Sequence, residues 1–171
     1  MRVAFEPTIH RVDLAEDRVH IGQLRTAILE SQVSGKSHLW MVNTPMGLPR
    51  QTLVECGIEL EWLAAAEWMA SFGSAREWRR AVRRTSRREP RRLCDVVGRA
   101  RHAPMNLRMF KRTWSTVVEL LLPLAKEGVR IAPVSGEAGA KVVVAEARSG
   151  GDGELWSGPV PRGALLEAWS F

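Results

Sequence analysis

The sequence predicts an α/β fold in which a small, mostly parallel sheet is flanked by helices. From Ser37 onwards, short apolar runs alternate with stretches of helical periodicity, which is typical of parallel strands joined by helical crossovers. A long amphipathic pattern begins at Asn106, and 45% of the 171 residues are apolar, enough to bury a core. We expect one α/β domain over residues 1–150 and a C-terminal tail over 151–171 that docks on the body or on a partner.

The first part of the chain predicts a strand, a helix and a second strand. Met1–Phe5 is a candidate strand, and residues 18–32 have the apolar spacing of a helix that Asp17 could cap. Ser37–Asn43 is a compact apolar run after Gly35, which indicates a buried strand.

The next segment predicts a short helix followed by an ambiguous stretch. Pro49–Glu55 has proline at its start and Gly57 just past its end, the asymmetry typical of helix termini. In Ile58–Leu63, apolar residues alternate with glutamates as in a strand, but the alanine-rich run that follows favours a helix.

An arginine-rich helix is predicted after Ser74, which can cap it. Trp78 and Val82 stand four residues apart and would share its apolar side. Pro90 should end or restart this helix. The run LCDVV at residues 93–97 fits either a buried strand or a helical turn.

The last part of the domain predicts a long helix and two strands. From Asn106 the apolar residues follow helical spacing, Pro123 should kink or end the helix, and Gly128 follows its end. Residues 129–134 and 141–147 predict two strands joined by a glycine-containing turn. As an alternative fold, a mainly α domain could carry these strands as the hairpin of a winged helix-turn-helix, with a helix in the major groove of DNA.

The positive charge is concentrated in one segment of the chain. The whole sequence has a net charge of +6, whereas residues 76–112 hold 14 basic residues against three acidic ones. Within this segment, four arginine pairs recur every four residues, and Pro90 interrupts the last interval. We call residues 79–92 the arginine ladder. Such local basicity favours a polyanion or an acidic protein surface as the partner.

The four-residue spacing itself favours a binding role over a merely solvated helix face. Like charges four apart on a helix repel by a few tenths of a kcal/mol each, so a helix that carries them gains from an approaching anion. Four residues rise about 6 Å along the axis, close to the distance between neighbouring phosphates of a nucleic-acid strand. The residues predicted to bind nucleic acid or an acidic partner are Arg79, Arg80, Arg83, Arg84, Arg87, Arg88, Arg91, Arg92, Arg99, Arg101, Lys111 and Arg112.

The sequence predicts no catalytic, metal or cofactor site. SGKSH at residues 34–38 is similar to the end of a P-loop, but Glu30 stands where the first glycine belongs, and the expected helix and strand come in the inverse order. The four histidines lack partners at metal-ligand spacing. No G-x-S-x-G motif is present. We therefore expect a protein that is not an enzyme.

The chain is expected to be cytoplasmic and to have no membrane partner. No apolar run is long enough to cross a bilayer, and the N-terminus does not read as a signal peptide. The two cysteines, Cys56 and Cys94, form no disulfide framework.

Several short segments together resemble one family. SHLWMVNTP, LVECGIELEWL, REWRRAVRR with LCDVV, and EGVRIAPVS with KVVVAEA resemble the SulA and ImuA family of degenerate RecA-like proteins, over about residues 37–147. The resemblance implies a RecA-like fold without a working P-loop, in a bacterial DNA-damage (SOS) setting. It implies either inhibition of the division protein FtsZ or service to a translesion polymerase. The arginine ladder and the tail depart from the family pattern, so no partner-binding residues carry over.

Three functions remain open at this point. The first is a non-catalytic accessory or regulatory protein that binds DNA or RNA through the arginine-rich helix, in a bacterial DNA-damage or mobile-element context. The second is a SulA-like inhibitor whose arginines bind an acidic protein such as FtsZ. The third is a winged-helix DNA-binding protein. A homo-oligomer is possible in each case.

Overall fold

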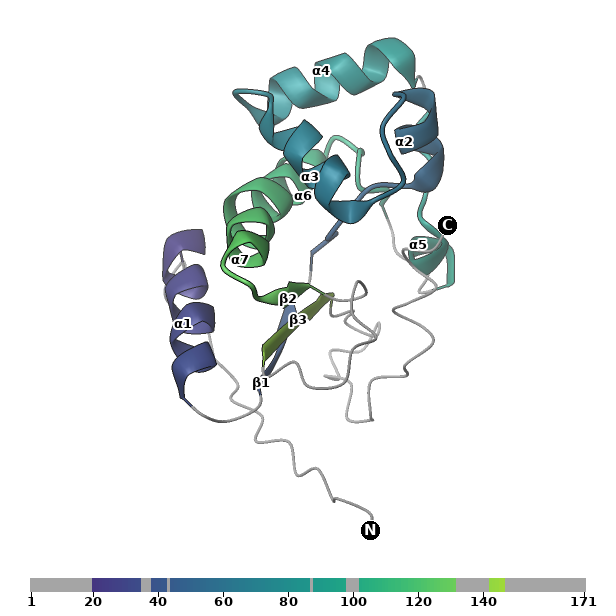
Figure 1. Cartoon of the computed structure of the whole chain (residues 1–171). Coiled ribbons are helices and arrows are strands. Elements are labelled where there is room, and N and C mark those ends of the chain that lie inside the picture. The colour runs from purple at the N-terminus through teal and green to yellow at the C-terminus, as the bar shows by residue number, and fades with distance from the viewer. Residues whose placement is uncertain are drawn as a thin grey trace.

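The computed structural model describes residues 20–34, 38–42, 44–86, 88–97, 102–131 and 142–146. Figure 1 shows α2, α3 and α4 gathered at one end of the molecule, the strands at the other, and α6 and α7 between them. The helices are α1 Ile21–Val33, α2 Arg50–Glu55, α3 Trp62–Ala70, α4 Ala75–Thr85, α5 Leu93–Val97, α6 Phe110–Ser115, the π-helical segment η1 Thr116–Leu121, and α7 Leu122–Lys126. The strands are β1 His38–Val42, β2 Arg130–Ile131 and β3 Val142–Glu146.

The predicted fold class is wrong, because helices dominate the described residues. The strands are only five, two and five residues long. They pair in parallel in the order β1-β3-β2, a patch too small to organise the fold as a doubly covered sheet would. Of the two segments that the sequence leaves open between strand and helix, LCDVV at 93–97 is the helix α5, and residues 58–61 precede α3, which begins at Trp62. Most of the core is therefore helix packed on helix.

The hairpin of the winged-helix alternative is also wrong. β2 pairs with β3 in parallel, with Arg130 opposite Val143 and Ile131 opposite Val144, whereas the two strands of a hairpin run antiparallel. β3 lies in the centre and pairs with β1 on its other side. The same two apolar runs thus contribute strands, but these strands do not pair as a hairpin.

Glycine ends two helices as the sequence predicts. Gly57 after α2 has φ +68°, and Gly128 after α7 has φ +80°, values that glycine adopts without steric cost. At each site the next residue donates its N–H back across the helix end, Ile58 to the carbonyl of Leu53 and Val129 to that of Leu124, both at 2.9 Å. These are Schellman motifs, and the first engages the N–H of Ile58 at the start of the ambiguous stretch.

The long helix runs through Pro123 instead of ending there. α6, η1 and α7 follow one another without interruption. The N–H of Leu122 pairs with the carbonyl of Val117, five residues earlier, and the wider π-helical turn accommodates a proline that has no N–H to donate and would crowd an α-helical turn. The Thr116 hydroxyl in this segment lies 2.9 Å from the Thr44 hydroxyl, which ties the helix to the chain after β1.

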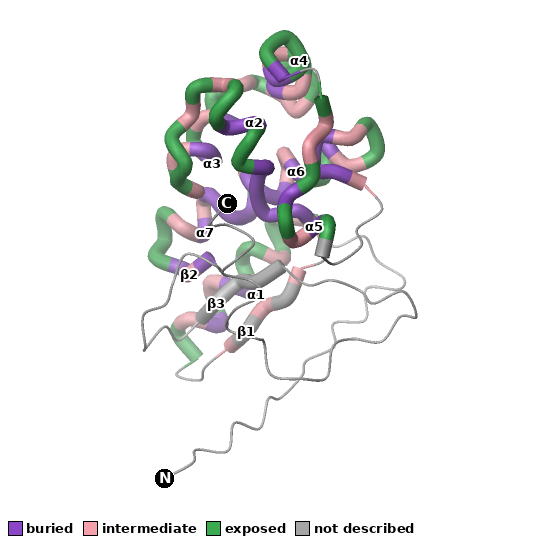
Figure 2. Tube along the Cα trace, turned by 90° about the vertical axis from the view of Figure 1, so that its right-hand side faces the viewer, coloured by how far each residue is buried: buried purple, intermediate pink, exposed green. Residues whose placement is uncertain are grey.

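Two adjoining clusters form the core, and Figure 2 shows buried positions concentrated around α6 and α7. One cluster joins α3, α4 and the long helix, with Met69, Trp78 and Val117 among its members. The other joins α1, the strands and the end of the long helix, with Ile28 and Leu121 fully buried. The long helix contributes to both clusters, so it connects the two halves of the fold.

Other predictions are confirmed or fall outside the described residues. The helix predicted at 18–32 is α1, the strand at 37–43 is β1, and the helix at 49–55 is α2. The strand at 1–5, the Asp17 cap, the turn at 135–140 and the tail at 151–171 lie outside the described ranges. Within those ranges, no helix is long and apolar enough to span a bilayer.

Candidate nucleic-acid interface

The arginine-rich helix α4 begins where the sequence predicts. The Ser74 hydroxyl accepts the N–H of Glu77 at 3.2 Å, which satisfies one of the open donors of the first turn. Glu77 in the first turn, and Arg83 and Arg84 in the last, complement the helix dipole. The local sequence therefore supports a helix in spite of its positive charge.

One side of α4 is fixed in the core. Trp78 and Val82 are four residues apart, so they lie on the same side, and their exposed fractions are 0% and 1%. They pack in the cluster that includes Met69 and Val117. The opposite side of α4 therefore faces away from the core, and its orientation is fixed by packing.

The arginine ladder is not one continuous helix. α4 ends at Thr85, and Ser86 has an extended backbone with φ −106° and ψ 101°. Glu89 precedes Pro90, and a residue before proline disfavours the α conformation, so the helix could not have continued to the proline. Of the four pairs, only the first two stand on α4, because the helix ends at Thr85, before the break that Pro90 predicts. Arg87 lies outside the described residues.

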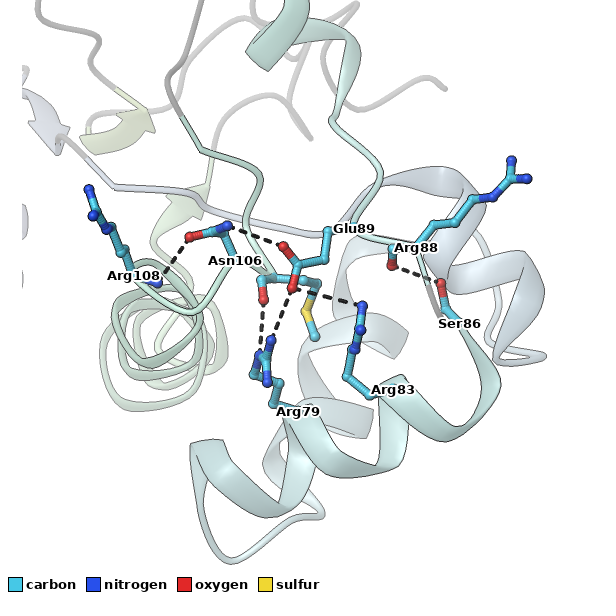
Figure 3. A network of polar contacts seen from close by, with 8 residues as sticks. Arg79, Arg83, Ser86, Arg88, Glu89, Asn106 and Arg108 are labelled. Atoms are coloured by element: carbon cyan, nitrogen blue, oxygen red, sulfur yellow. Dashed lines mark hydrogen bonds and ion pairs between the residues drawn. The ribbon is translucent and has the colours of Figure 1, made fainter.

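Arg79 faces inward and fastens α4 to the body (Figure 3). Its Nη2 lies 3.0 Å from Glu89 Oε1, and its Nε donates to the Met105 carbonyl at 3.1 Å. Its guanidinium lies over the Phe110 ring, 5.2 Å from the ring centroid, a cation–π contact. With its side chain 20% exposed, Arg79 holds the structure together and is poorly placed to receive a phosphate.

Glu89 collects several partners at this junction. Its Oε2 accepts a hydrogen bond from Asn106 Nδ2 at 3.2 Å, and Arg83 Nη1 lies 3.9 Å from its Oε1. Asn106 in turn accepts the N–H of Arg108 on its Oδ1. One carboxylate thus links α4, the segment after α4 and the turn before α6 (Figure 3).

Arg92 is also structural, which corrects its assignment as a binding residue. Its Nε and Nη2 reach the two carboxylate oxygens of Asp95 at 2.9 and 2.6 Å, and both side chains are 2% exposed. The backbone N–H of Arg92 also donates to Asp95 at 3.0 Å. This local pair opens α5, which explains why residues 93–97 form a helix and not a strand.

The other described basic residues of the predicted site are exposed. Of the predicted residues, Arg80, Arg83 and Arg84 are exposed on α4, and Arg88 and Arg91 are exposed after it. The Arg88 side chain extends away from Glu89 (Figure 3). Lys111 and Arg112 are exposed on α6, which packs against α4. Arg99 and Arg101 lie outside the described residues.

The sequence-based site omitted Arg76, which is exposed one turn before Arg80. The sequence contains a pattern that could have identified Arg76, because Arg76, Arg80 and Arg84 repeat at the same four-residue interval. We call these three residues the outer arginines of α4; Arg83 is also exposed, but its guanidinium faces Glu89. On a helix of 3.6 residues per turn, all three point away from Trp78 and Val82. The only acid of α4 is Glu77.

The described residues offer no grouping typical of a metal centre. Among them, no three or more His, Cys, Asp or Glu side chains come together in a way that could hold a metal ion. The Cys56 thiol is half-buried, and burial together with the neighbouring Glu55 raises its pKa, which disfavours the reactive thiolate.

Comparison with known proteins gave no match to a family model, a curated protein or a solved structure. The resemblance to the SulA and ImuA family stays a prediction.

We predict that Glu89→Gln destabilises the fold by about 1–2 kcal/mol, because it removes the negative charge that faces Arg79 and Arg83 in a partly buried position. Urea unfolding followed by circular dichroism measures this change. Glu59→Gln, at an exposed glutamate, is the matched control and should change stability by less than about 0.5 kcal/mol. Equal stability of the two variants would contradict the role of Glu89.

We also predict that Asp95→Ala costs about 3–5 kcal/mol, because it leaves the buried guanidinium of Arg92 without its carboxylate. The same unfolding experiment applies, with Glu30→Ala at an exposed site on α1 as the control. A loss no larger than that of the control would show that Arg92 is solvated and available for binding.

Proposed function

We propose that the chain is an accessory protein that binds nucleic acid by presenting the outer arginines of α4 to phosphate groups. The observation that carries the proposal is the division of α4 into two sides. Trp78 and Val82 are buried on one side, and Arg76, Arg80 and Arg84 are exposed on the other. A rigid helix that holds guanidiniums at successive turns is suited to a regular polyanion.

The chemistry of arginine favours phosphate as the ligand. The guanidinium is planar, stays charged and can donate two parallel hydrogen bonds to phosphate oxygens. Arg76, Arg80 and Arg84 follow one another at about 6 Å along the axis, so each can meet a different phosphate of one strand. Contacts of this kind position the protein on nucleic acid without reading its sequence.

The carboxylates of this segment lie on its inner side, so the electrostatic field on the exposed side of α4 stays positive. Glu89 and Asp95 are engaged with Arg79 and Arg92 on the inner side of the segment, and Glu77 is the third and last acid of residues 76–112. The outer arginines therefore add their charges along the exposed side of α4. A concentrated positive field increases the rate of encounter with a polyanion.

Binding to duplex DNA should weaken linearly on a log–log plot against salt concentration, with a slope of roughly −3 if each outer arginine contacts one phosphate. Arg80→Ala combined with Arg84→Ala should make this slope shallower by about 1.8. Fluorescence anisotropy of labelled duplexes of unrelated sequence measures the slope, and the affinities should be similar for all sequences.

Arg25→Ala combined with Lys126→Ala is the matched control, since it removes the same charge from exposed positions outside α4. It should leave the slope unchanged within experimental error. If the two double variants lower affinity equally, binding reflects net charge and not α4. If neither duplex nor single strands bind at low salt, the nucleic-acid function is wrong.

A further inference from the structure

The stretch of chain that precedes α4 has the opposite charge to the arginine-rich segment. Residues 51–74 contain four glutamates and neither lysine nor arginine, whereas residues 76–112 hold 14 basic residues against three acidic ones. The four glutamates, Glu55, Glu59, Glu61 and Glu67, are all exposed. The protein therefore presents negative and positive charge from neighbouring parts of the chain.

Two exposed leucines stand among these glutamates. Leu60 lies between α2 and α3 and is 48% exposed, and Leu63 in the first turn of α3 is 45% exposed. Together with Glu59 and Glu61 they form what we call the acidic surface. Aliphatic groups flanked by charges at an exposed position are typical of protein–protein contact sites.

Two anchors hold the acidic surface in a fixed conformation. On one side, the N–H of Ile58 donates to the Leu53 carbonyl at 2.9 Å. On the other side, Trp62 Nε1 donates to the Met46 carbonyl at 2.7 Å. The side chains of Ile58 and Trp62 both pack against the core, so residues 59–61 are held between two fastened positions. A surface that is ordered before binding loses little conformational entropy when a partner arrives.

The carboxylates of the acidic surface are open to a partner. Within the described part of the chain, the ion pairs involve Glu67, Glu89 and Asp95, and neither Glu59 nor Glu61 takes part in one. Glu67 lies 3.6 Å from Lys126, so it is already partly neutralised and we do not count it in the surface.

The outer arginines of α4 are complementary to this surface in charge and in chemistry. Their guanidiniums can pair with carboxylates, and their aliphatic stems can cover exposed leucines. Glu77 is the only acid on α4, so positive charge prevails there. Figure 2 shows the exposed positions of α4 at the top of the molecule and those of α3 on the left-hand side. Because the two surfaces face different directions, the arginines of one copy are directed to another copy and not to their own acidic surface.

We infer that the acidic surface of one copy of the chain binds the outer arginines of a second copy. Glu59 and Glu61 pair with the guanidiniums, and Leu60 and Leu63 pack on the arginine stems. Such an interface is heterologous, because it joins two unlike surfaces. It covers the arginines that are proposed to contact phosphate, so self-association and nucleic-acid binding exclude each other there. Only this competition rests on the proposed function.

Sedimentation velocity of the full chain over a range of protein concentrations tests the inference. We expect association that depends on concentration and weakens as salt is added, because the paired charges are exposed. Glu59→Lys combined with Glu61→Lys should weaken it by about tenfold or more, since like charges then face one another. Leu60→Ser combined with Leu63→Ser should also weaken it. Circular dichroism verifies that the variants are folded.

The matched control is Glu30→Lys combined with Glu127→Lys, which makes the same change of charge at exposed positions outside the acidic surface. It should associate as the unchanged protein does. The inference is overturned if the unchanged protein is monomeric at every concentration at low salt, or if the control weakens association as much as the change at Glu59 and Glu61.

A charge exchange identifies the second copy as the partner. Arg80→Glu combined with Arg84→Glu should abolish self-association, as should Glu59→Lys combined with Glu61→Lys. A mixture of these two variants should associate again, because each supplies the charge that the other has lost. If the mixture stays monomeric, the two surfaces do not meet and the inference is wrong.

Addition of duplex DNA separates this inference from the proposed function. DNA should release single copies from the assembly, since both partners need the outer arginines. If the assembly forms and no DNA binds, the proposed function fails and the self-association stands. If DNA binds to the intact assembly without dissociating it, the outer arginines are not the interface and the inference is overturned.

Discussion

The contact of Arg79 with Glu89 is the interaction on which the basic segment depends. Without it, α4 would carry its arginines next to one another with only Glu77 to offset them. Glu89 neutralises the inward guanidinium and, through Asn106, connects α4 to the turn that precedes α6. The stacking of Arg79 on Phe110 adds an apolar contact to the same junction. The outer arginines are therefore presented from a helix that is held on its inner side by packing, charge and hydrogen bonds.

The arginines of this segment therefore form two groups, one structural and one exposed. Arg79 and Arg92 are inside, each with a carboxylate, and both are needed for the shape of the region. Arg80 and Arg84 are exposed one turn apart. The residues that stabilise the surface are thus neighbours in sequence of the residues that form it, so deletion of the whole run would destroy the fold and the binding surface together.

Local signals in the sequence predicted the helix ends but not the fold class. Ser74, Gly57 and Gly128 act through contacts a few residues away, so their effect can be read directly. The composition of LCDVV suits a strand and a buried helical turn equally. The contact of Arg92 with Asp95 stabilises the helix, and this contact could not be recognised in the sequence because Arg92 is one of many arginines there. In the site, helical geometry could have identified Arg76. The sequence could not show that Arg79 faces inward while Arg80 is exposed, because this difference depends on the position of Glu89 in the folded structure.

The central claim is that the outer arginines meet phosphate while Arg79 and Arg92 serve the fold. Modification of arginine side chains with phenylglyoxal, with and without duplex DNA and read by mass spectrometry, tests it most directly. The account predicts that Arg76, Arg80 and Arg84 react in the free protein and are protected by DNA, while Arg79 and Arg92 react slowly in both states. Protection confined to other arginines, or rapid modification of Arg79 and Arg92 in the free protein, would contradict it.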